Sequence, residues 1–376
     1  MKIAVIAPWV PAIKGNSLAA SLARSLSKHS NRVDFIVHTM KADLEGDLRY
    51  ILGEKVNLIT LHKSVEEKIS SYRYLKLQYF SKIDKDLTDY ILAHGDYELI
   101  LLISNEGRGV ARKLRKKFPN NRSVNLITAI IVQELIDYSF DLNREGIPYY
   151  IRKLFLFLKP IFRYIERKRL TSFDLVYSNS SWTSKNLWDL YDIKSRMSLA
   201  LYDDENFKLE EINIKEEQIA VPTASLNNSG SGLLLRLSKD GVPLVAFGPN
   251  GVSGLKNLGF LPTRDMCRLI SISKATLFHF DYEALGLIPL ESLSLGTPVI
   301  TIPEQGPYGE LKDNRFVSFF KDYDSLLKIC KDLLHTNQDI IYRQACSNSV
   351  SDFRSEIVVG RFLEDVRNYL RGENHF

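Results

Sequence analysis

Along this chain, short apolar segments typical of strands alternate with segments whose apolar residues recur at helical spacing. Short apolar runs rich in β-branched residues are typical of buried parallel strands, and segments with apolar residues at helical spacing follow them. Near the N-terminus, these patterns predict a strand at 2–7, a helix at 16–29 and a strand at 32–39. A strand, a loop, a helix and a strand at this spacing predict a βαβ unit, which opens a doubly wound sheet.

The same alternation continues to the end of the chain. Further strands are predicted at 97–104, 123–132, 173–180, 243–251 and 275–281, and further helices at 263–273, 324–336 and about 355–371. Thr263 is expected to open the helix at 263–273. The predicted fold class is α/β, with two Rossmann-like doubly wound domains that face a cleft.

A charged segment of weak periodicity at 200–218 separates the two alternating halves. We therefore expect a first domain at 1–205, a second at 206–354, and a C-terminal helix within 355–376 that packs back on the first domain. The length of 376 residues suits two domains.

Composition and charge exclude several classes of protein. The formal net charge is +5, from 50 basic and 45 acidic residues, which is too mild for a nucleic-acid-binding protein. Three cysteines without CxxC spacing disfavour a disulfide framework and a cysteine-built zinc site, so a cytoplasmic location is expected. The sequence shows no signal peptide and no apolar run long enough to span a membrane.

The stretch "EALGLIPLESLSLGTPVI", from Glu283 to Ile300, carries the strongest chemical signal. Glu283 is expected in the loop after a strand, and Glu291 in the first turn of the next helix, which Gly296 ends. A carboxylate accepts two hydroxyl hydrogens, so Glu291 suits the ribose diol and Glu283 suits the hydroxyls of a sugar. Gly286 would let a phosphate approach the helix start, which favours anions. Together these groups predict a nucleotide sugar as ligand.

These positions have simpler interpretations as well. Glu291 could complement the helix dipole, Glu283 could be a surface acid, and Gly286 could be a turn glycine.

The stretch resembles the E-x7-E motif of retaining glycosyltransferases of family 4, which have the GT-B fold. The resemblance implies that Glu283 is the catalytic-site acid on the donor sugar and that Glu291 holds the ribose. It also implies that the backbone of residues 285–287 (Leu285, Gly286 and Leu287) faces the donor phosphates, and that Gly15 lies near the diphosphate or acceptor. The first domain would serve the acceptor and the second the nucleotide-sugar donor. Neither a metal nor a cofactor besides the donor is implied.

The chain departs from the family pattern at two points. No basic residue lies between Ile219 and Leu235, where the family has a diphosphate clamp, and "NLITAIIVQEL" at 125–135 lacks the family's histidine. Either backbone groups of "SLNNSGSG" at 225–232 or Lys256 could replace the clamp, although Lys256 could equally be a solvated lysine. The departures raise an alternative function, a non-catalytic protein that binds sugar nucleotides or glycans. A nicotinamide-dependent oxidoreductase is disfavoured because the first strand lacks a G-x-G-x-x-G turn.

A basic amphipathic segment at 149–170 suggests a place for the acceptor. On a helix, one face carries Arg152, Lys159, Arg163 and Arg167, and the opposite face carries Leu154, Phe157, Leu158, Ile161 and Ile165. The segment either contacts the inner membrane surface, with a lipid-linked acceptor, or packs its apolar face on the first sheet with the basic face solvated. Pro160 is expected to interrupt the helix. A soluble glycan or a protein-linked glycan remains the other class of acceptor.

Overall fold

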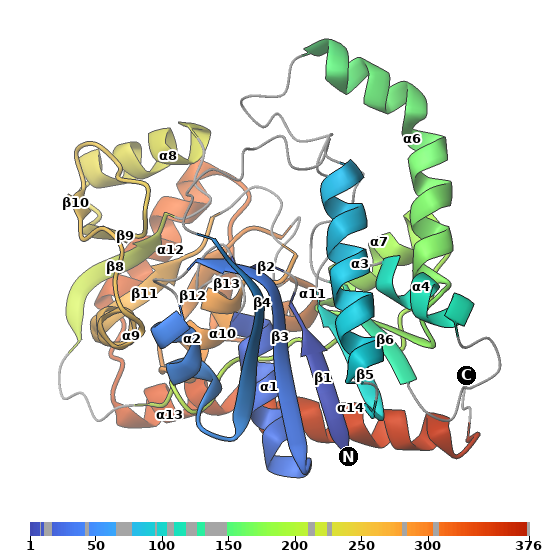
Figure 1. Ribbon diagram of the computed structural model, residues 1–376. Coiled ribbons are helices and arrows are strands. Elements are labelled where there is room, and N and C mark those ends of the chain that lie inside the picture. The colour runs from blue at the N-terminus through green and yellow to red at the C-terminus, as the bar shows by residue number, and fades with distance from the viewer. Residues whose placement is uncertain are drawn as a thin grey trace. The chain divides into compact units, whose positions relative to one another are not determined.

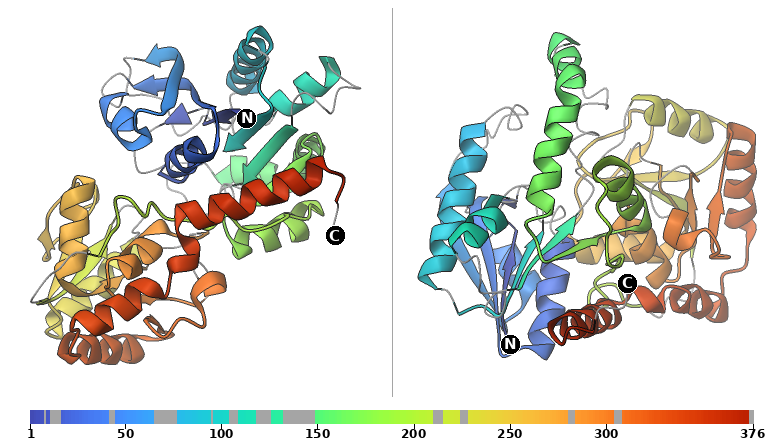
Figure 2. Two further views of the ribbon diagram at one scale, coloured as in Figure 1. Left: turned by 90° about the horizontal axis from the view of Figure 1, so that it is seen from below. Right: turned by 90° about the vertical axis from the view of Figure 1, so that its right-hand side faces the viewer.

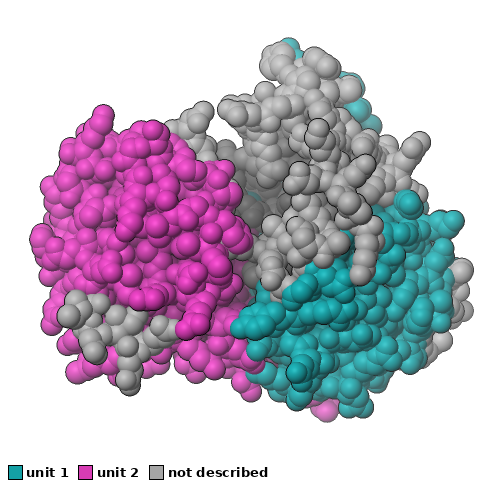
Figure 3. Space-filling model, turned by 60° about the vertical axis from the view of Figure 1, so that its left-hand side comes forward, with its two compact units in different colours: residues 1–199 teal, residues 200–376 magenta. Residues whose placement is uncertain are grey.

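The computed structural model describes residues 1–7, 9–10, 17–41, 45–64, 77–94, 96–103, 109–117, 126–131, 149–209, 215–223, 228–279, 284–303 and 308–373. The chain divides into two compact units, residues 1–199 and 200–376, which Figure 3 colours separately. The boundary expected from the sequence lay at 205/206.

Unit 1 is built on one parallel sheet (Figure 1). Its strands are β1 (Lys2–Ile6), β2 (Trp9–Val10), β3 (Arg32–Lys41), β4 (Val56–Ser64), β5 (Leu99–Ile103), β6 (Leu126–Ile131) and β7 (Leu175–Ser178). Its helices are α1 (Ser17–His29), α2 (Glu45–Leu52), α3 (Leu77–Ala93), α4 (Gly109–Lys117), α6 (Tyr149–Leu170) and α7 (Ser181–Tyr191).

The order of the strands in unit 1 follows the doubly wound plan. In the described residues the order is β2-β3-β1-β5-β6-β7, with β4 beside β3, so the chain winds outward from β1 first to β3 and then to β5. The central strands β1 and β5 are buried along nearly their whole length, because helices cover the sheet. This is why they appear in the sequence as unbroken apolar runs.

Unit 2 repeats the plan with six strands. The strands are β8 (Glu216–Pro222), β9 (Leu244–Phe247), β10 (Lys256–Asn257), β11 (Ser273–Leu277), β12 (Val299–Thr301) and β13 (Val317–Phe319). The helical elements are α8 (Asn228–Lys239), α9 (Thr263–Ile272), α10 (Leu287–Ser294), α11 (Tyr308–Leu311), α12 (Tyr323–His335), α13 (Ile340–Asn348), the 3₁₀ turn η4 (Ser351–Phe353) and α14 (Ser355–Leu370).

The sheet of unit 2 has the order β10-β9-β8-β11-β12-β13, with every described pair parallel. Successive residues of β8 face opposite sides of this sheet. Ile219 and Val221 join a core with α8 and α12, whereas Ala220 joins a core with α9, α10 and α13. Helices therefore cover both faces. The predicted fold class, two Rossmann-like doubly wound domains, is confirmed.

One local prediction was wrong. α6 is one helix from Tyr149 to Leu170 with Pro160 inside it, and Figure 1 shows that it bends rather than stops, as a helix with an internal proline can. α9 begins at Thr263, as predicted, and its N-cap Pro262 makes no side-chain cap hydrogen bond. In the segment 225–232, whose backbone groups were one possible replacement for the clamp, the residues from Asn228 onward are the first turns of α8, so the N–H groups there are those of a helix N-terminus.

The three cysteines, Cys267, Cys330 and Cys346, are free and buried. Burial raises the pKa of both the Cys330 and the Cys346 thiol to about 12, so these two stay protonated near neutral pH. They act as small apolar residues of the core of unit 2.

Candidate functional site

The topology of unit 2 marks one place on the sheet for a ligand. The chain winds from β8 through β9 to β10 on one side, and β11 then returns to the other side of β8. In such sheets ligands bind outside the carboxyl ends of the strands, at the point where the winding direction reverses. That point is the carboxyl edge between β8 and β11. α8 follows β8 and α10 follows β11, so two helix N-termini belong to this edge.

The start of α10 lies inside the predicted motif. Its N-cap is Gly286, with φ 68° and ψ 103°, a conformation that glycine adopts without steric cost. The first N–H groups of a helix, here those of Leu287 and Ile288, have no acceptor within the helix, and glycine offers no side chain to cap them. Such N–H groups and the positive end of the helix dipole attract a phosphate.

Gly286 also has a packing reason to lack a side chain. A Cβ on Gly286 would lie 2.7 Å from Cε1 of Phe278, whose ring fills that space. Phe278 is itself buried, and its N–H donates to the carbonyl of Ile300 at 2.8 Å. The missing Cβ is thus explained by the fold, and the predicted close approach of a ligand is not needed to explain it.

Glu291 lies deeper than the sequence suggested. α10 begins at Leu287, so Glu291 is in the second turn and not the first, and it is only 6% exposed. A buried carboxylate is costly unless hydrogen-bond donors surround it. Stabilisation of the helix dipole by an exposed acid is therefore a weak explanation for Glu291, and a role that needs its acceptor oxygens is favoured.

Hydroxyl groups of the motif fix α10 to the sheet. The hydroxyls of Ser292 and Thr276 of β11 hydrogen-bond at 2.8 Å, and Ser292 Oγ also donates to the carbonyl of Thr297 at 3.0 Å. The Thr297 hydroxyl in turn donates to the carbonyl of Ile270 at 2.9 Å. The small residues of the motif thus set the position of the helix start from which the site is built.

A buried lysine supports the other end of α10. Lys215 Nζ donates to the carbonyl of Ser273 and to Thr297 Oγ1, both at 2.8 Å. Burial, followed by repulsion from Arg343, lowers the pKa of Lys215 to about 7. Gly296 ends the helix with φ 76°, as predicted, and a Cβ there would lie 2.9 Å from Cβ of Arg343.

The other predicted residues are distributed as follows. Glu283 and Gly15 lie outside the described residues. Leu285 is buried in the core beside α10, and Leu287 packs partly against the same core, so only their backbone groups could meet a ligand. Lys256 is exposed on the edge strand β10, with β9 and β8 between it and β11. Three strand spacings amount to roughly 14 Å, which is longer than a lysine side chain. Lys256 can meet a phosphate only if that group extends from α10 across β8.

Two polar residues that the sequence did not single out lie at the same carboxyl edge. Thr223 follows β8, and its N–H and hydroxyl both contact the carbonyl of Phe247 at the end of β9, at 2.8 and 3.1 Å. Asn250 Nδ2 donates to the carbonyl of Thr223 at 3.0 Å. These groups border the ends of β8 and β9. Each is a polar residue just after a predicted strand, a signal too common in sequences to single them out.

The apolar face of α6 was also assigned wrongly in one of the two interpretations. Phe157 is 81% exposed and Ile161 56%, and Tyr164 and Ile165 are exposed beside them. Lys159 and Arg163 are half-buried, whereas Glu166 and Leu170 are buried. Phe157, Ile161 and Ile165 of the predicted apolar face therefore do not pack on the sheet of unit 1. Figures 1 and 2 show the N-terminal end of α6 reaching away from the sheet of unit 1.

Residues 254–350 match the model of the family "Glycosyl transferases group 1". This segment runs from β10 to the end of α13 and contains α10 with the whole predicted motif. No curated protein is a match to the chain.

Solved structures share the fold over the whole chain at low identity. Sucrose-phosphate synthase from Thermosynechococcus elongatus is 14% identical with a TM-score of 0.75, over 99% of this chain and 100% of that one. The Anabaena protein HepE in complex with UDP-glucose is 12% identical with a TM-score of 0.66, over 98% of this chain and 100% of that one. A glycosyltransferase from Rickettsia africae is 13% identical with a TM-score of 0.65, over 99% of each chain.

These likenesses establish the two-domain GT-B fold. With the family match at 254–350, they support a sugar-transferring enzyme. Among the described helices, none is both long and apolar enough to cross a membrane.

Proposed function

We propose that this protein is a retaining glycosyltransferase that moves a sugar from a nucleotide diphosphate sugar to an acceptor hydroxyl. In this reaction the bond between the sugar's anomeric carbon and the diphosphate oxygen breaks, and the diphosphate leaves with the bonding electrons. A new bond to the acceptor oxygen forms on the same face of the sugar, and the acceptor loses its hydroxyl proton.

One observation carries the proposal. The N-terminus of α10 stands at the reversal point of the unit 2 sheet, within the segment that matches the group 1 glycosyl transferases. Backbone N–H groups of residues 285–287 would hold the diphosphate there, and Glu291 would accept the ribose hydroxyls. Glu283, four residues before the helix, would contact the hydroxyls of the sugar.

The leaving diphosphate needs charge stabilisation, which the proposal assigns to the protein and not to a metal. No basic residue lies between Ile219 and Leu235, so a cationic clamp is missing from the start of unit 2. The N-termini of α8 and α10, with Thr223 at the end of β8, would supply donors in its place, and Lys256 and Gly15 are the further candidates.

The residues exposed on α6 indicate the class of acceptor. Phe157 and Ile161 offer apolar surface, and Lys153, Arg167 and Lys168 lie exposed along the same helix. An apolar strip with cations beside it favours the inner surface of an anionic membrane, so the proposed acceptor is lipid-linked.

The missing clamp favours one competing function, a protein that binds a sugar nucleotide or glycan without transferring it. A panel of UDP-, GDP-, ADP- and dTDP-sugars in thermal unfolding would first identify the base. UDP-sugars form the first arm because the Anabaena neighbour was solved with UDP-glucose. A ligand at 100 times its dissociation constant should stabilise the protein by about 2.7 kcal/mol.

The sugar released or transferred from the selected donor is then measured for the wild type and for Glu283→Ala. Transfer should fall strongly in Glu283→Ala, while the affinity for the free nucleoside diphosphate stays nearly unchanged, because the proposed partner of Glu283 is the sugar. Binding of the donor without any turnover on lipid-linked and soluble acceptors would favour the non-catalytic function. Stabilisation by none of the four donors would contradict the glycosyltransferase and the sugar-nucleotide-binding protein, and would leave only the binding of a glycan.

A further inference from the structure

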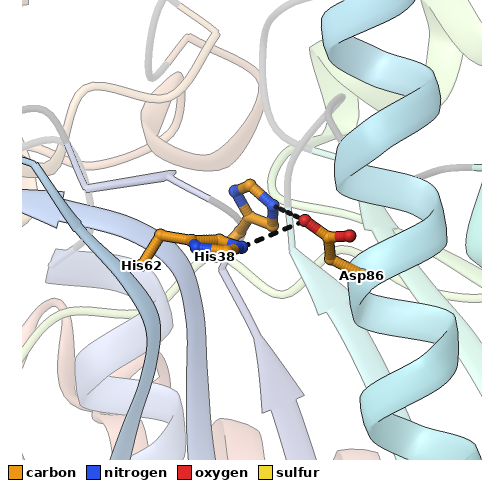
Figure 4. Close-up of side chains that lie close together, drawn as sticks. All are labelled: His38, His62 and Asp86. Carbon is orange, nitrogen blue, oxygen red and sulfur yellow. Dashed lines mark hydrogen bonds and ion pairs between the residues drawn. The ribbon is translucent and has the colours of Figure 1, made fainter.

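Three side chains from distant parts of unit 1 meet at one point (Figure 4). His38 comes from β3, His62 from the neighbouring β4, and Asp86 from α3. His38 Nε2 lies 3.1 Å from Asp86 Oδ2, and His62 Nε2 lies 3.0 Å from the same oxygen. The two imidazole rings are 4.8 Å apart between centroids. Two nitrogens and one carboxylate oxygen thus converge.

The fold holds these groups in place. Thr39, next to His38, is in register with His62 in the parallel pair of β3 and β4. α3 packs on the sheet through the buried Ile83 and Leu87, which flank Asp86 in the sequence. The three side chains therefore meet because rigid elements bring them together, which is what a preorganised site requires.

We propose that His38, His62 and Asp86 bind a divalent transition-metal ion, with Zn²⁺ as the ion their chemistry fits best. The ligand atoms are Nε2 of both histidines and Oδ2 of Asp86. This site lies in unit 1, on elements that the proposed donor site of unit 2 does not use, and it is independent of the proposed function.

The observed distances suit such an ion. Zn²⁺ binds histidine nitrogen and carboxylate oxygen at about 2.0–2.2 Å in a tetrahedral arrangement, which places two ligand atoms about 3.3–3.5 Å apart. The two nitrogen-to-oxygen distances here are 3.1 and 3.0 Å. Each nitrogen-to-oxygen pair would separate by a few tenths of an ångström to admit the ion. The two imidazole nitrogens, which lie within 4.8 Å of each other, would take up the same spacing.

A neighbouring hydroxyl orients one of the ligands. His38 Nδ1 lies 2.8 Å from Thr39 Oγ1, so a proton on Nδ1 can be donated to that hydroxyl and Nε2 is left with a lone pair for the metal. Burial lowers the pKa of His38, and His62 and Lys82 lower it further, against the raising effect of Asp86. Metal ligation requires this neutral form of histidine.

The ligand set also limits the choice of ion. Mg²⁺ and Ca²⁺ prefer shells made of oxygen, whereas two imidazoles and a carboxylate suit Zn²⁺ and its first-row neighbours. His38 is 3% exposed, Asp86 24% and His62 48%, so the cluster runs from the interior to the surface. An ion held here has an entry path, and three protein ligands leave a fourth position for water or a partner group.

The competing explanation is a hydrogen-bonded cluster in which two histidines share one carboxylate and no metal binds. The two are separated by titrating tag-free, metal-stripped protein with Zn²⁺ and Mg²⁺ in calorimetry, and by the visible spectrum with Co²⁺. We expect one Zn²⁺ per chain at this site, no competition by Mg²⁺, and the intense absorption of Co²⁺ in a low-symmetry nitrogen–oxygen site.

Variants assign the binding to these residues. His62→Gln and Asp86→Asn should lower Zn²⁺ affinity at least about 100-fold, since loss of even an outer-shell partner costs about 10–100-fold. Thr39→Val removes only such an outer-shell partner, so its loss of Zn²⁺ affinity should be about 10–100-fold. The control is His29→Gln, which removes an exposed histidine at the end of α1 and should bind Zn²⁺ as the wild type does. Circular dichroism and the apo melting temperature verify that each variant is folded.

Absence of Zn²⁺ and Co²⁺ binding by folded wild type would overturn the proposal. Equal affinity in the wild type and in both ligand variants would overturn it too, because the bound ion would then sit elsewhere. Neither result would affect the donor-binding experiments on unit 2.

Discussion

The ring of Phe278 occupies the space that a side chain on Gly286 would need. A Cβ there would lie 2.7 Å from Cε1 of the ring, and the φ of Gly286 is 68°. This contact joins the end of β11 to the start of α10, where the proposed diphosphate site lies.

Gly286→Ala should therefore destabilise the protein. Overpacking costs about 1–3 kcal/mol, and the positive φ adds roughly 1 kcal/mol for a residue with a side chain. Urea unfolding measures the loss. Phe278→Leu makes room, so the double variant should lose less than the sum of the two single losses. Additive losses would show that the ring is not the obstacle. The matched control is Gly232→Ala in α8, where a Cβ meets nothing within 4 Å.

Glu291→Gln should weaken nucleotide binding and leave the fold intact. A charge-assisted hydrogen bond contributes about 1.5–3 kcal/mol, so affinity for the nucleoside diphosphate should fall about tenfold or more. Calorimetry with the ribonucleotide and its 2′-deoxy analogue checks the assignment, because the deoxy analogue should lose less. The control is Glu217→Gln, an exposed acid on β8 of the same unit. Equal affinity in the wild type and Glu291→Gln would refute a ribose contact.

Replacing the exposed apolar residues of α6 should reduce binding to anionic vesicles. Phe157→Ser with Ile161→Ser removes side chains that are 81% and 56% exposed, so stability should change little. Full burial of each wild-type side chain in the membrane would contribute about 1.5–3 kcal/mol to binding. Because these side chains would insert only partly, the partition coefficient of the variant onto vesicles should fall about tenfold or more. Co-sedimentation at low and high salt measures it, and the cationic part should weaken as salt rises.

The control for that experiment is Tyr50→Ser, which removes a 79% exposed aromatic residue from α2. It should sediment with vesicles as the wild type does. Wild type that ignores anionic vesicles at low ionic strength would show that α6 is not a membrane contact.

Stability should rise with pH just above neutrality because of Lys215. Its pKa is about 7 in the folded protein, against an ordinary lysine value of 10.5. Between these values the unfolded chain binds more protons, so the free energy of unfolding increases with pH. The penalty from this lysine is full below pH 7 and is lost as pH approaches 10.5. From pH 7 to 8.5 the gain should be about 1–2 kcal/mol.

Urea midpoints of wild type and Lys215→Met at pH 7, 7.5, 8 and 8.5 test this. The variant should show a flatter profile, whatever its absolute stability. The window stops at 8.5 because the raised pKa values of Cys330 and Cys346 make stability fall at higher pH. Parallel profiles would mean that Lys215 is charged in the folded protein at neutral pH.

The sequence by itself determined part of the elements and the likeness of the motif. The apolar run of β1 and the helical spacing of α1 report local backbone conformation and burial, and both elements lie where the pattern placed them. The turn at Gly296 was equally readable, because a positive φ after a helix is a local requirement that glycine meets. Because these features depend only on residues close together in the sequence, they could be predicted without the tertiary structure.

Only the tertiary structure decided which elements are neighbours. The pairing of β8 with β11 places α8 and α10 at one edge, and no local pattern encodes a pairing between strands distant in the chain. The depth of Glu291 likewise depends on what covers α10, and the exposure of Phe157 depends on what does not cover α6. His38, His62 and Asp86 are each ordinary residues in sequence. Their meeting is a consequence of packing, which is set by contacts far apart along the chain and is therefore invisible to the period of any one segment.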